Sequence, residues 1–339
     1  MRTLVAVGQA ALNKCRVAYF DGAQWNIFPF PDIVGRLWCC YSPSATKLWV
    51  AGGTGALGLT APILYYWDGA VWTNFSSAIS DAVYLIRIDG NGPNNVWVTG
   101  GATGALVSGA WNFNGASWTA TKVNTIEIGA NNETSVSSQG HVYHVDMSGA
   151  FGSGANIYSN VANPNFALFG TFGTFGLDAV SDSAVFATRN SGKRIAKYTT
   201  SWAVVELGQS AEIVAALDAD NYIYVESISP GGTIYKTGNI ALSGASTILS
   251  TIGPNHGALA YLAQDDIWAA TIRWGVTWGS VPQLTHYEGG LSWSGPTNYN
   301  ANGLDAISWY DLAPFTIYTN PLPAKTPSGS LFLDNLRLE

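Results

Sequence analysis

The chain has 339 residues, of which 47% are hydrophobic and 11% charged, and its formal net charge is −7. Because soluble domains are usually about 25% charged, this composition predicts a large buried core. The acidic balance and the lack of a basic stretch disfavour nucleic-acid binding. No apolar run approaches the roughly 18 to 20 residues of a membrane helix, so we expect no membrane insertion.

The amino-terminal segment is the first predicted strand, and its apolar run stops at Gly8 and Gln9. A signal-peptide core needs about 7 to 15 apolar residues, so we expect no secretion by that route. Of the three cysteines, Cys39 and Cys40 are neighbours, and on a strand their side chains would point to opposite faces. Together with Cys15, they predict buried or half-buried thiols and no disulfide framework.

Internal repetition is the strongest signal in the chain. The clearest unit joins two motifs, at 48–53 (LWVAGG) and 65–72 (YYWDGAVW). Parts of the same unit recur at 19–25 (YFDGAQW), 96–101 (VWVTGG), 111–118 (WNFNGASW) and 286–293 (HYEGGLSW). Equivalent positions return at intervals of roughly 37 to 50 residues, which is the length of one four-stranded propeller blade.

The repeats predict an all-β protein, folded as a single β-propeller of seven, alternatively eight, four-stranded blades. Asp-Gly and Asn-Gly pairs in the motifs indicate tight hairpins, and no long segment has the 3.6-residue period of a helix. The candidate inner strands lie near 36–40, 83–88, 125–128, 177–181, 213–217, 258–262 and 304–309. In a seven-bladed ring, the strand at 304–309 would complete the blade begun by residues 3–28.

Two further segments, 315–318 and 331–335, also look like blade strands and would give eight blades. We favour seven, because a ring that lacks an inner strand leaves unpaired backbone groups at the channel. The predicted domains are then a propeller over residues 1–311 and, over 312–339, a carboxyl-terminal tail or the strands of a last blade.

The repeat unit resembles the kelch motif, in which a double glycine follows an apolar strand and a Tyr precedes a Trp by six residues. Double glycines stand at 52–53 and 100–101, and the Tyr–Trp spacing is kept at 19–25, 66–72 and 287–293. The resemblance implies a propeller. It does not imply an activity, because kelch-like propellers serve as binding modules and occasionally as enzymes.

We expect no enzyme activity, no metal and no cofactor. His141 and His144 are three residues apart on a predicted strand, so they would face opposite sides and could not share a metal. Asp218, Asp220 and Asn221 predict an Asx turn between two strands, since the run lacks the spacing of an EF-hand loop.

Binding is expected instead, through the loops at 53–62, 101–109, 148–154 and 271–282 and through the channel. The candidate binding residues are Arg36, Arg87, Trp111, Trp274 and Trp278. Arg36 and Arg87 occupy comparable places in consecutive units, as recognition of a carboxylate by a sialidase would require. An exported glycan-binding or sialidase-like glycoside hydrolase is therefore the alternative function.

The composition, with 38 Gly and only 2 Met, resembles that of bacteriophage virion components such as decoration or receptor-binding proteins. This resemblance implies a structural role on the virion, with other virion proteins or a host-surface glycan as partners. It also allows a homo-oligomer. The alternative location is extracellular.

Overall fold

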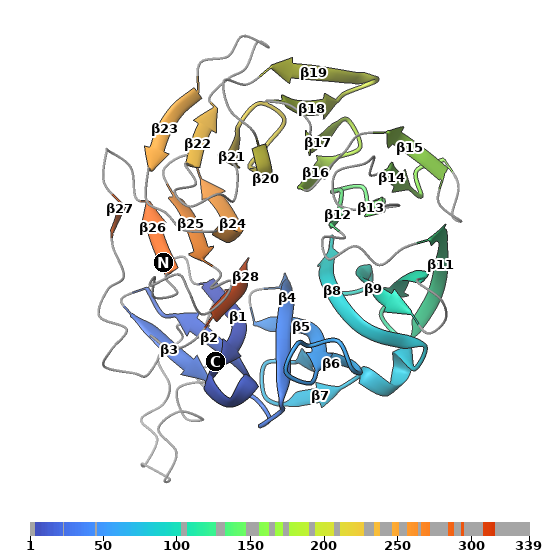
Figure 1. Cartoon of the computed structure of the whole chain (residues 1–339), viewed down its shortest axis with the longest axis vertical. Helices are drawn as coiled ribbons and strands as arrows, with labels where there is room; N and C mark the ends of the chain where they lie inside the picture. The colour runs from blue at the N-terminus through green and yellow to red at the C-terminus, as the bar shows by residue number, and fades with distance from the viewer. Residues whose placement is uncertain are drawn as a thin grey trace.

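The computed structural model describes residues 4–22, 24–44, 46–102, 107–126, 133–146, 156–162, 167–171, 176–189, 194–206, 211–226, 234–237, 246–250, 256–263, 266–271, 284–287, 293–294 and 308–315. Within these residues, the strands form seven four-stranded sheets arranged in a ring (Figure 1). Short 3₁₀ turns occur at Ala11–Asn13 and Ser76–Ile79. The described part contains no helix of the length and apolarity needed to cross a membrane. The predicted all-β propeller is confirmed.

Each blade is an antiparallel meander that runs from an inner to an outer strand. In that order, blade 1 consists of β28 (Ser308–Pro314), β1 (Leu4–Ala10), β2 (Lys14–Phe20) and β3 (Trp25–Phe28). Blade 2 consists of β4 (Gly35–Ser44), β5 (Lys47–Thr54), β6 (Pro62–Trp67) and β7 (Trp72–Asn74). Blade 3 consists of β8 (Ala82–Gly90), β9 (Val96–Ala102), β10 (Val107–Phe113) and β11 (Trp118–Ile126).

Blade 4 consists of β12 (Thr134–Val136), β13 (Val142–Asp146), β14 (Asn156–Ser159) and β15 (Ala167–Thr171). Blade 5 consists of β16 (Leu177–Ser181), β17 (Ala184–Arg189), β18 (Arg194–Tyr198) and β19 (Trp202–Glu206). Blade 6 consists of β20 (Ala211–Ala216), β21 (Tyr222–Glu226), β22 (Ile234–Thr237) and β23 (Ser246–Ser250). Blade 7 consists of β24 (His256–Ala263), β25 (Asp266–Thr271), β26 (Leu284–Tyr287) and β27 (Trp293–Ser294).

The second strand of each early blade is mostly apolar and buried because both of its faces are covered by neighbouring blades. In β9, every residue is buried. In β5, Val50 packs with Val5 and other residues of blade 1, whereas Trp49 packs with Val98 and other residues of blade 3. A middle strand of a blade therefore has no solvent-exposed face, and its side chains alternate between two hydrophobic interfaces.

The double glycine of the repeat is explained by a close approach of backbone. A Cβ on Gly52 would lie 1.9 Å from the carbonyl oxygen of Arg36, and one on Gly100 would lie 2.0 Å from that of Tyr84. In both blades the inner strand bulges beside this glycine. Glycine is needed there because any side chain would push the bulged inner strand away.

The Asp-Gly and Asn-Gly pairs form the hairpin turns between the two outer strands of a blade. Asp68 accepts hydrogen bonds from the amides of Ala70 and Val71 through the same oxygen, at 2.8 and 2.9 Å. Asn114 holds the matching turn of blade 3 in the same way. Gly69 has φ of +107°, a conformation that favours glycine. The hairpins predicted from the motif are confirmed.

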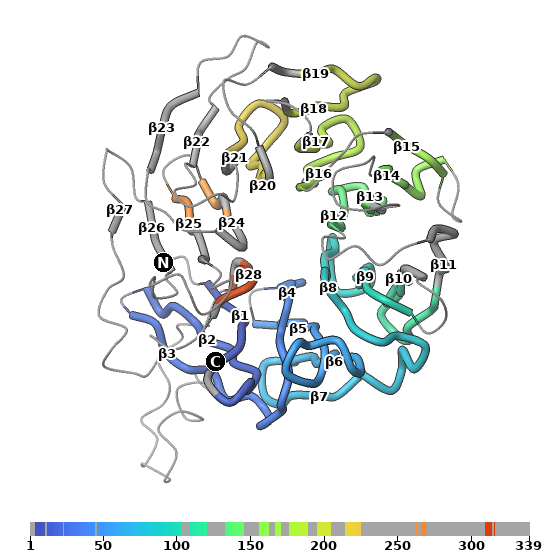
Figure 2. Tube along the Cα trace, viewed as in Figure 1, coloured from blue at the N-terminus to red at the C-terminus, as the bar shows by residue number. Residues whose placement is uncertain are grey.

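The ring is closed by pairing of the last described strand with the first. β28 pairs antiparallel with β1, from Leu4 opposite Pro314 to Gln9 opposite Ser308, and the two lie side by side in Figure 2. The expectation that a carboxyl-terminal strand completes the first blade is confirmed. The strand lies later than the predicted 304–309, and it runs to Pro314, which has no amide hydrogen with which to continue the pairing.

One predicted inner strand is wrong. Residues 125–126 continue the outer strand of blade 3, where Ile126 pairs with Val107, and residues 127–128 lie outside the described part. The inner strand of blade 4 is β12, which pairs with β13. An apolar alternation alone does not distinguish the end of a long outer strand from the start of the next inner one.

The seven sheets of the described residues agree with the favoured blade number. The segments that suggested an eighth blade lie outside the described part, apart from Phe315. The division at residues 311 and 312 stays a prediction, although the closing strand itself includes residues on both sides of it.

The three cysteines are free and buried, as the sequence predicted. Desolvation by burial raises the pKa of Cys15 to about 12 and raises the pKa values of Cys39 and Cys40 well above their ordinary value. Such thiols remain protonated at neutral pH and act as small hydrophobic side chains.

Candidate functional site

Arg36 lies on β4 at the junction of blades 1 and 2, and its side chain is half-buried. Its Nε donates a hydrogen bond of 3.0 Å to the carbonyl oxygen of Ala56. The guanidinium carbon lies 5.2 Å from the ring centre of Trp38 and 5.9 Å from that of Tyr310. These contacts hold the guanidinium in one orientation, because a cation is attracted to the faces of both rings.

The loop over residues 54–61, between β5 and β6, covers this cluster. The carbonyl of Gly58 accepts a hydrogen bond of 3.4 Å from Trp38 Nε1. A Cβ on Gly58 would lie 2.8 Å from that nitrogen and 2.9 Å from the Cβ of Arg36, and Gly58 also has φ of +70°. The 54–61 loop can therefore lie against the cluster only with glycine at this position.

Arg87, on β8, forms an ion pair with Glu133, which precedes β12 in the next blade. Nη2 lies 2.5 Å from Oε1, and Nε lies 2.7 Å from Oε2. Desolvation alone would lower the pKa of Arg87, but the charge and hydrogen bonds of Glu133 raise it above its ordinary value. A guanidinium already held by a two-point carboxylate contact joins blades 3 and 4 and is not available to a ligand carboxylate.

The two arginines do not occupy comparable places, so this part of the expectation is wrong. Arg36 pairs with Gly53, the second glycine of its motif. Arg87 pairs with Thr99, which stands two residues before the second glycine of the next motif. The residue of blade 3 in the register of Arg36 is Tyr84. Arg36 and Arg87 therefore do not form the arginine pair that a sialidase-like site would need.

Trp111 is 1% exposed, so the expectation that it lies at an accessible loop or channel surface is wrong. It belongs to the hydrophobic cluster between blades 2 and 3, and its Nε1 donates a hydrogen bond of 2.9 Å to Asp81. Trp274 and Trp278 lie outside the described residues, as do residues 103–106 of the loop at 101–109, the whole loop at 148–154 and residues 272–282 of the last loop.

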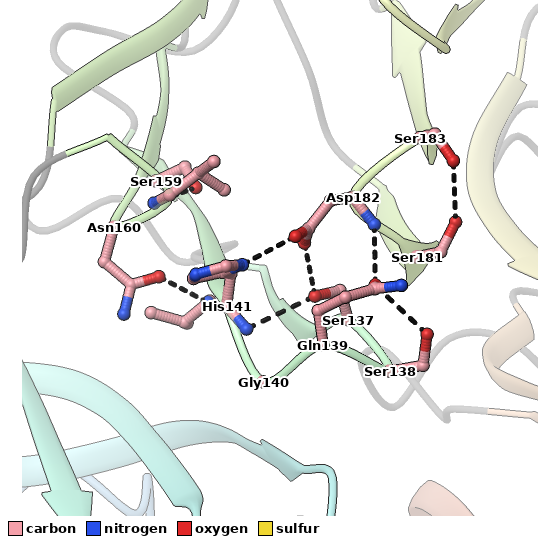
Figure 3. Close-up of polar contacts among 12 residues, drawn as sticks. Ser137, Ser138, Gln139, Gly140, His141, Ser159, Asn160, Ser181, Asp182 and Ser183 are labelled. Atoms are coloured by element: carbon pink, nitrogen blue, oxygen red, sulfur yellow. Dashed lines mark hydrogen bonds and ion pairs between the residues drawn. The ribbon is translucent and has the colours of Figure 1, made fainter.

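A serine, a histidine and an aspartate meet between blades 4 and 5 (Figure 3). Ser137 Oγ and His141 Nδ1 both contact the carboxylate of Asp182, each at 2.6 Å. In a catalytic triad the serine would contact the imidazole, and the aspartate would contact the other ring nitrogen. Here both side chains contact the carboxylate, and Ser137 is 0% exposed. The arrangement joins two blades and does not activate a nucleophile.

The charge of Asp182 is stabilised by this network. Desolvation alone would raise its pKa, but hydrogen bonds from Ser137, His141 and Tyr143 hold the pKa below its ordinary value. The backbone amide of Asp182 also donates a hydrogen bond of 3.0 Å to the Gln139 side chain. The carboxylate of Asp182, in blade 5, therefore accepts hydrogen bonds from side chains of blade 4 and connects the two blades.

His144 faces the other side of its blade from His141, as predicted. Its Nδ1 lies 3.0 Å from Thr134 Oγ1, which in turn lies 2.7 Å from Thr99 Oγ1 of blade 3. Burial lowers the pKa of His144 to about 4, so the ring is neutral at physiological pH. The described residues include no cluster of three or more His, Cys, Asp or Glu that could hold a metal ion.

The predicted Asx turn is confirmed at Asp218. One carboxylate oxygen accepts hydrogen bonds from the amides of Asp220 and Asn221, each at 2.8 Å. These bonds explain the Asp and Asn residues of this run without any cation.

A second set of carboxylates joins inner strands of adjacent blades. Asp311, Asp89 and Asp178 each accept a hydrogen bond from a backbone amide of the next blade, at 2.9, 2.7 and 2.7 Å. The three donors are, in the same order, the amides of Cys40, Val136 and Ala216. Desolvation between the blades raises the pKa of Asp89 to about 7 and those of Asp178 and Asp311 to about 6.

Sequence reasoning found Arg36 and the 53–62 loop but missed Trp38 and Tyr310. A signal for Trp38 was present, because residues i and i+2 of a strand share a face. No comparable signal exists for Tyr310, whose ring centre lies 4.6 Å from that of Trp38 only because the ring closes there. The Arg36 cluster and the 54–61 loop are therefore the best candidate site in the described part.

Comparisons with known proteins support the fold and leave the activity open. No protein-family model matches the chain, and no curated protein sequence matches it. Among solved structures, YCF48 from Cyanidioschyzon merolae is 14% identical, with 80% of this chain and 88% of that chain covered and a TM-score of 0.52. TolB from Acinetobacter baumannii is 12% identical, with 93% and 67% covered and a TM-score of 0.51.

A chain from a structural and mechanistic study of two prolyl endopeptidases is 10% identical, with a TM-score of 0.55. The match covers 86% of this chain but only 49% of that one. Identities this low establish a shared fold and nothing about shared chemistry.

Proposed function

We propose that the chain is a non-enzymatic binding or scaffold propeller, which contacts its partner through loops at one face of the ring. The observation that carries this proposal is the 54–61 loop, which is fixed to a closed ring while its side chains stay exposed. Leu57 is 63% exposed and Leu59 is 46% exposed, although the loop backbone is hydrogen-bonded to Arg36 and Trp38. Loops presented by a rigid scaffold are a common place for binding.

The kelch-like assignment and a role in a bacteriophage virion are finer parts of the same proposal. The kelch-like assignment is supported by the double glycines of blades 2 and 3 and by the hairpin turns that blades 1, 2 and 3 share. The virion role is supported by composition alone, in particular by 38 Gly, 2 Met and 11% charged residues. Other virion proteins or a host-surface glycan would then be the partners, and the protein would be on the virion or, alternatively, extracellular.

The test compares binding with turnover on the full chain. A glycan array and a selection from a displayed peptide library measure binding, while a panel of aryl glycosides, including a sialoside, measures hydrolysis. We expect specific binding in at least one of the first two assays and no hydrolysis above the uncatalysed rate. Hydrolysis that survives repurification would replace this proposal by the glycoside hydrolase alternative.

The virion role has its own test, which is detection of the chain by mass spectrometry in purified phage particles. Co-purification in a fixed ratio to the capsid protein supports it. Recovery of the chain only in the particle-free fraction would contradict the virion role but would leave the binding function standing.

A further inference from the structure

Four exposed apolar side chains lie at the junction of blades 1 and 2, around the Arg36 cluster. Leu12 is 84% exposed, Val34 is 47% exposed, and Leu57 and Leu59 of the 54–61 loop are also exposed. We call these four residues and Arg36 the blade 1–blade 2 surface. Scattered apolar residues are common on protein surfaces, but a group on adjacent segments marks an interaction site.

Backbone contacts bring the segments of this surface together. Lys14, two residues beyond Leu12, forms a β-bridge with Val34. The carbonyl of Val34 accepts a hydrogen bond of 3.1 Å from Gly55, at the start of the 54–61 loop. The Gln9 side chain donates to Ala56 in that loop at 3.2 Å. The surface is therefore contiguous and fixed to the ring.

Leu12 is held outward by an unfavourable backbone conformation. Its φ is +59° and that of Asn13 is +56°, in the left-handed region that non-glycine residues rarely adopt. A leucine that is both strained and 84% exposed gains nothing for the fold from its side chain. Strain of this kind is a reason to look for a function.

The charge of this surface is positive and centred on Arg36. Two other cations lie nearby: Lys14 is already paired with Asp32 at 2.7 Å, and Arg16 Nη1 donates a hydrogen bond to the carbonyl of Cys15. Among the described residues, no carboxylate lies within ion-pair distance of Arg36, and its only hydrogen bond is made by Nε. Both Nη atoms can therefore form the two-point contact that guanidinium makes with a carboxylate.

The neighbours of Arg36 favour a protein partner over a sugar. The exposed apolar side chains of this surface are leucine and valine, which offer no hydrogen bonds to hydroxyl groups, and the indole N–H of Trp38 already donates to the carbonyl of Gly58. The loop carbonyls of Ala56 and Gly58 already accept bonds from Arg36 and Trp38. Arginine and tryptophan among exposed aliphatic residues are typical of the centre of a protein interface.

We infer that the blade 1–blade 2 surface is a docking site for a partner protein segment that carries an aspartate or glutamate beside apolar residues. The acidic side chain binds Arg36, and the apolar residues cover Leu12, Val34, Leu57 and Leu59. This inference rests on the proposed binding function and adds the class of partner to it.

The test is a selection of random 12-residue peptides, displayed on phage, against the immobilised full chain. We expect the enriched peptides to share an acidic residue within three positions of an apolar one. Affinities of the best peptide are then measured with the native chain, Arg36→Gln, Arg36→Lys and the double variant Leu57→Ser/Leu59→Ser. The matched control is Val71→Ser, because Val71 is 58% exposed at the opposite end of β6.

The expected result is at least a tenfold loss of affinity for Arg36→Gln and for the double leucine variant, and less than a twofold change for Val71→Ser. Arg36→Lys should lie between, because an ammonium keeps the charge without the two-point contact. Replacing the acidic residue of the peptide by its amide should weaken binding to the native chain but not to Arg36→Gln. Thermal unfolding of each variant confirms that it is folded.

The inference is overturned if the enriched peptides lack acidic residues, if nothing is enriched, or if Val71→Ser weakens binding as much as the others. Equal binding of a glycan by the native chain and by Arg36→Gln would also overturn the assignment of this docking site, but it would leave the proposed binding function standing. A glycan whose binding requires Arg36 would assign the surface to a sugar instead of a protein.

Discussion

Asp311 and Cys40 are 271 positions apart in the sequence, yet the amide of Cys40 donates a hydrogen bond of 2.9 Å to Asp311 Oδ2. The other oxygen of Asp311 accepts from the amide of Leu312, also at 2.9 Å. One side chain therefore connects the strand that closes the ring to the inner strand of blade 2. The same kind of contact is made by Asp89 and Asp178 at two other blade junctions.

The first prediction is that Asp311→Ala destabilises the protein at pH 7.5 by about 2 to 3 kcal/mol, because both backbone amides lose their acceptor. Asp311→Asn should lose less, since its one carbonyl oxygen can still accept from Cys40. Urea unfolding followed by tryptophan fluorescence measures both variants. Equal losses for alanine and asparagine would show that the acceptor role is not what stabilises this junction.

The second prediction concerns pH. The pKa values of about 7 for Asp89 and about 6 for Asp178 lie above the unfolded value of about 3.9. Such groups hold a proton more tightly in the folded state. Their contribution to the free energy of unfolding is therefore fully present below about pH 4 and is lost as the pH rises through the folded pKa. The native chain should therefore lose stability relative to Asp89→Asn as the pH rises from about 4 to about 7.

The measurement is the difference in unfolding free energy between native protein and variant at each pH. The change for Asp89→Asn should end about one pH unit above that for Asp178→Asn, near pH 7 and near pH 6, which makes each variant a control for the other. If the native chain became more stable relative to the variant as the pH rises, the raised pKa values would be contradicted. His144 acts in the opposite direction below about pH 6.5, but its contribution is common to all of these chains and cancels.

The third prediction is that Arg87 and Glu133 stabilise the junction of blades 3 and 4 as a pair. Arg87→Gln and Glu133→Gln should each destabilise the protein, because each leaves a partly buried charge without its partner. The double variant should be more stable than the sum of the two losses implies, with a coupling energy of about 1 to 3 kcal/mol. Additive losses in the unfolding experiment would show that the two charges do not interact.

The fourth prediction is that Gly100→Ala destabilises the protein by about 3 kcal/mol, because its Cβ would lie 2.0 Å from the carbonyl oxygen of Tyr84. Gly92→Ala is the control. No atom lies within 4 Å of a Cβ there, although φ is +151°, so we expect a loss of about 1 kcal/mol. Thermal unfolding distinguishes the two, and a loss at Gly92 as large as that at Gly100 would contradict the steric explanation.

Much of the fold could be predicted from the sequence because its determinants are local. The apolar run of β9, the double glycines and the Asp-Gly and Asn-Gly turns are each specified within a few residues. They recur at the period of a blade, and a blade cannot bury its own faces, so repetition implies a ring. The strand at 125–128 was misassigned because local alternation does not mark where one blade ends.

The candidate site was decided largely by the tertiary structure. Arg36 and the 54–61 loop carry a local signal, but Tyr310 reaches them only through closure of the ring by β28. Similarly, the sequence predicts that Arg36 and Arg87 occupy comparable places. In the structure, Arg87 pairs with Thr99 in the strand register and forms an ion pair with Glu133. The repeated motifs determine how each sheet forms. The residues that meet between sheets depend on bulges and register in two blades at once, and these are set only when the blades pack together.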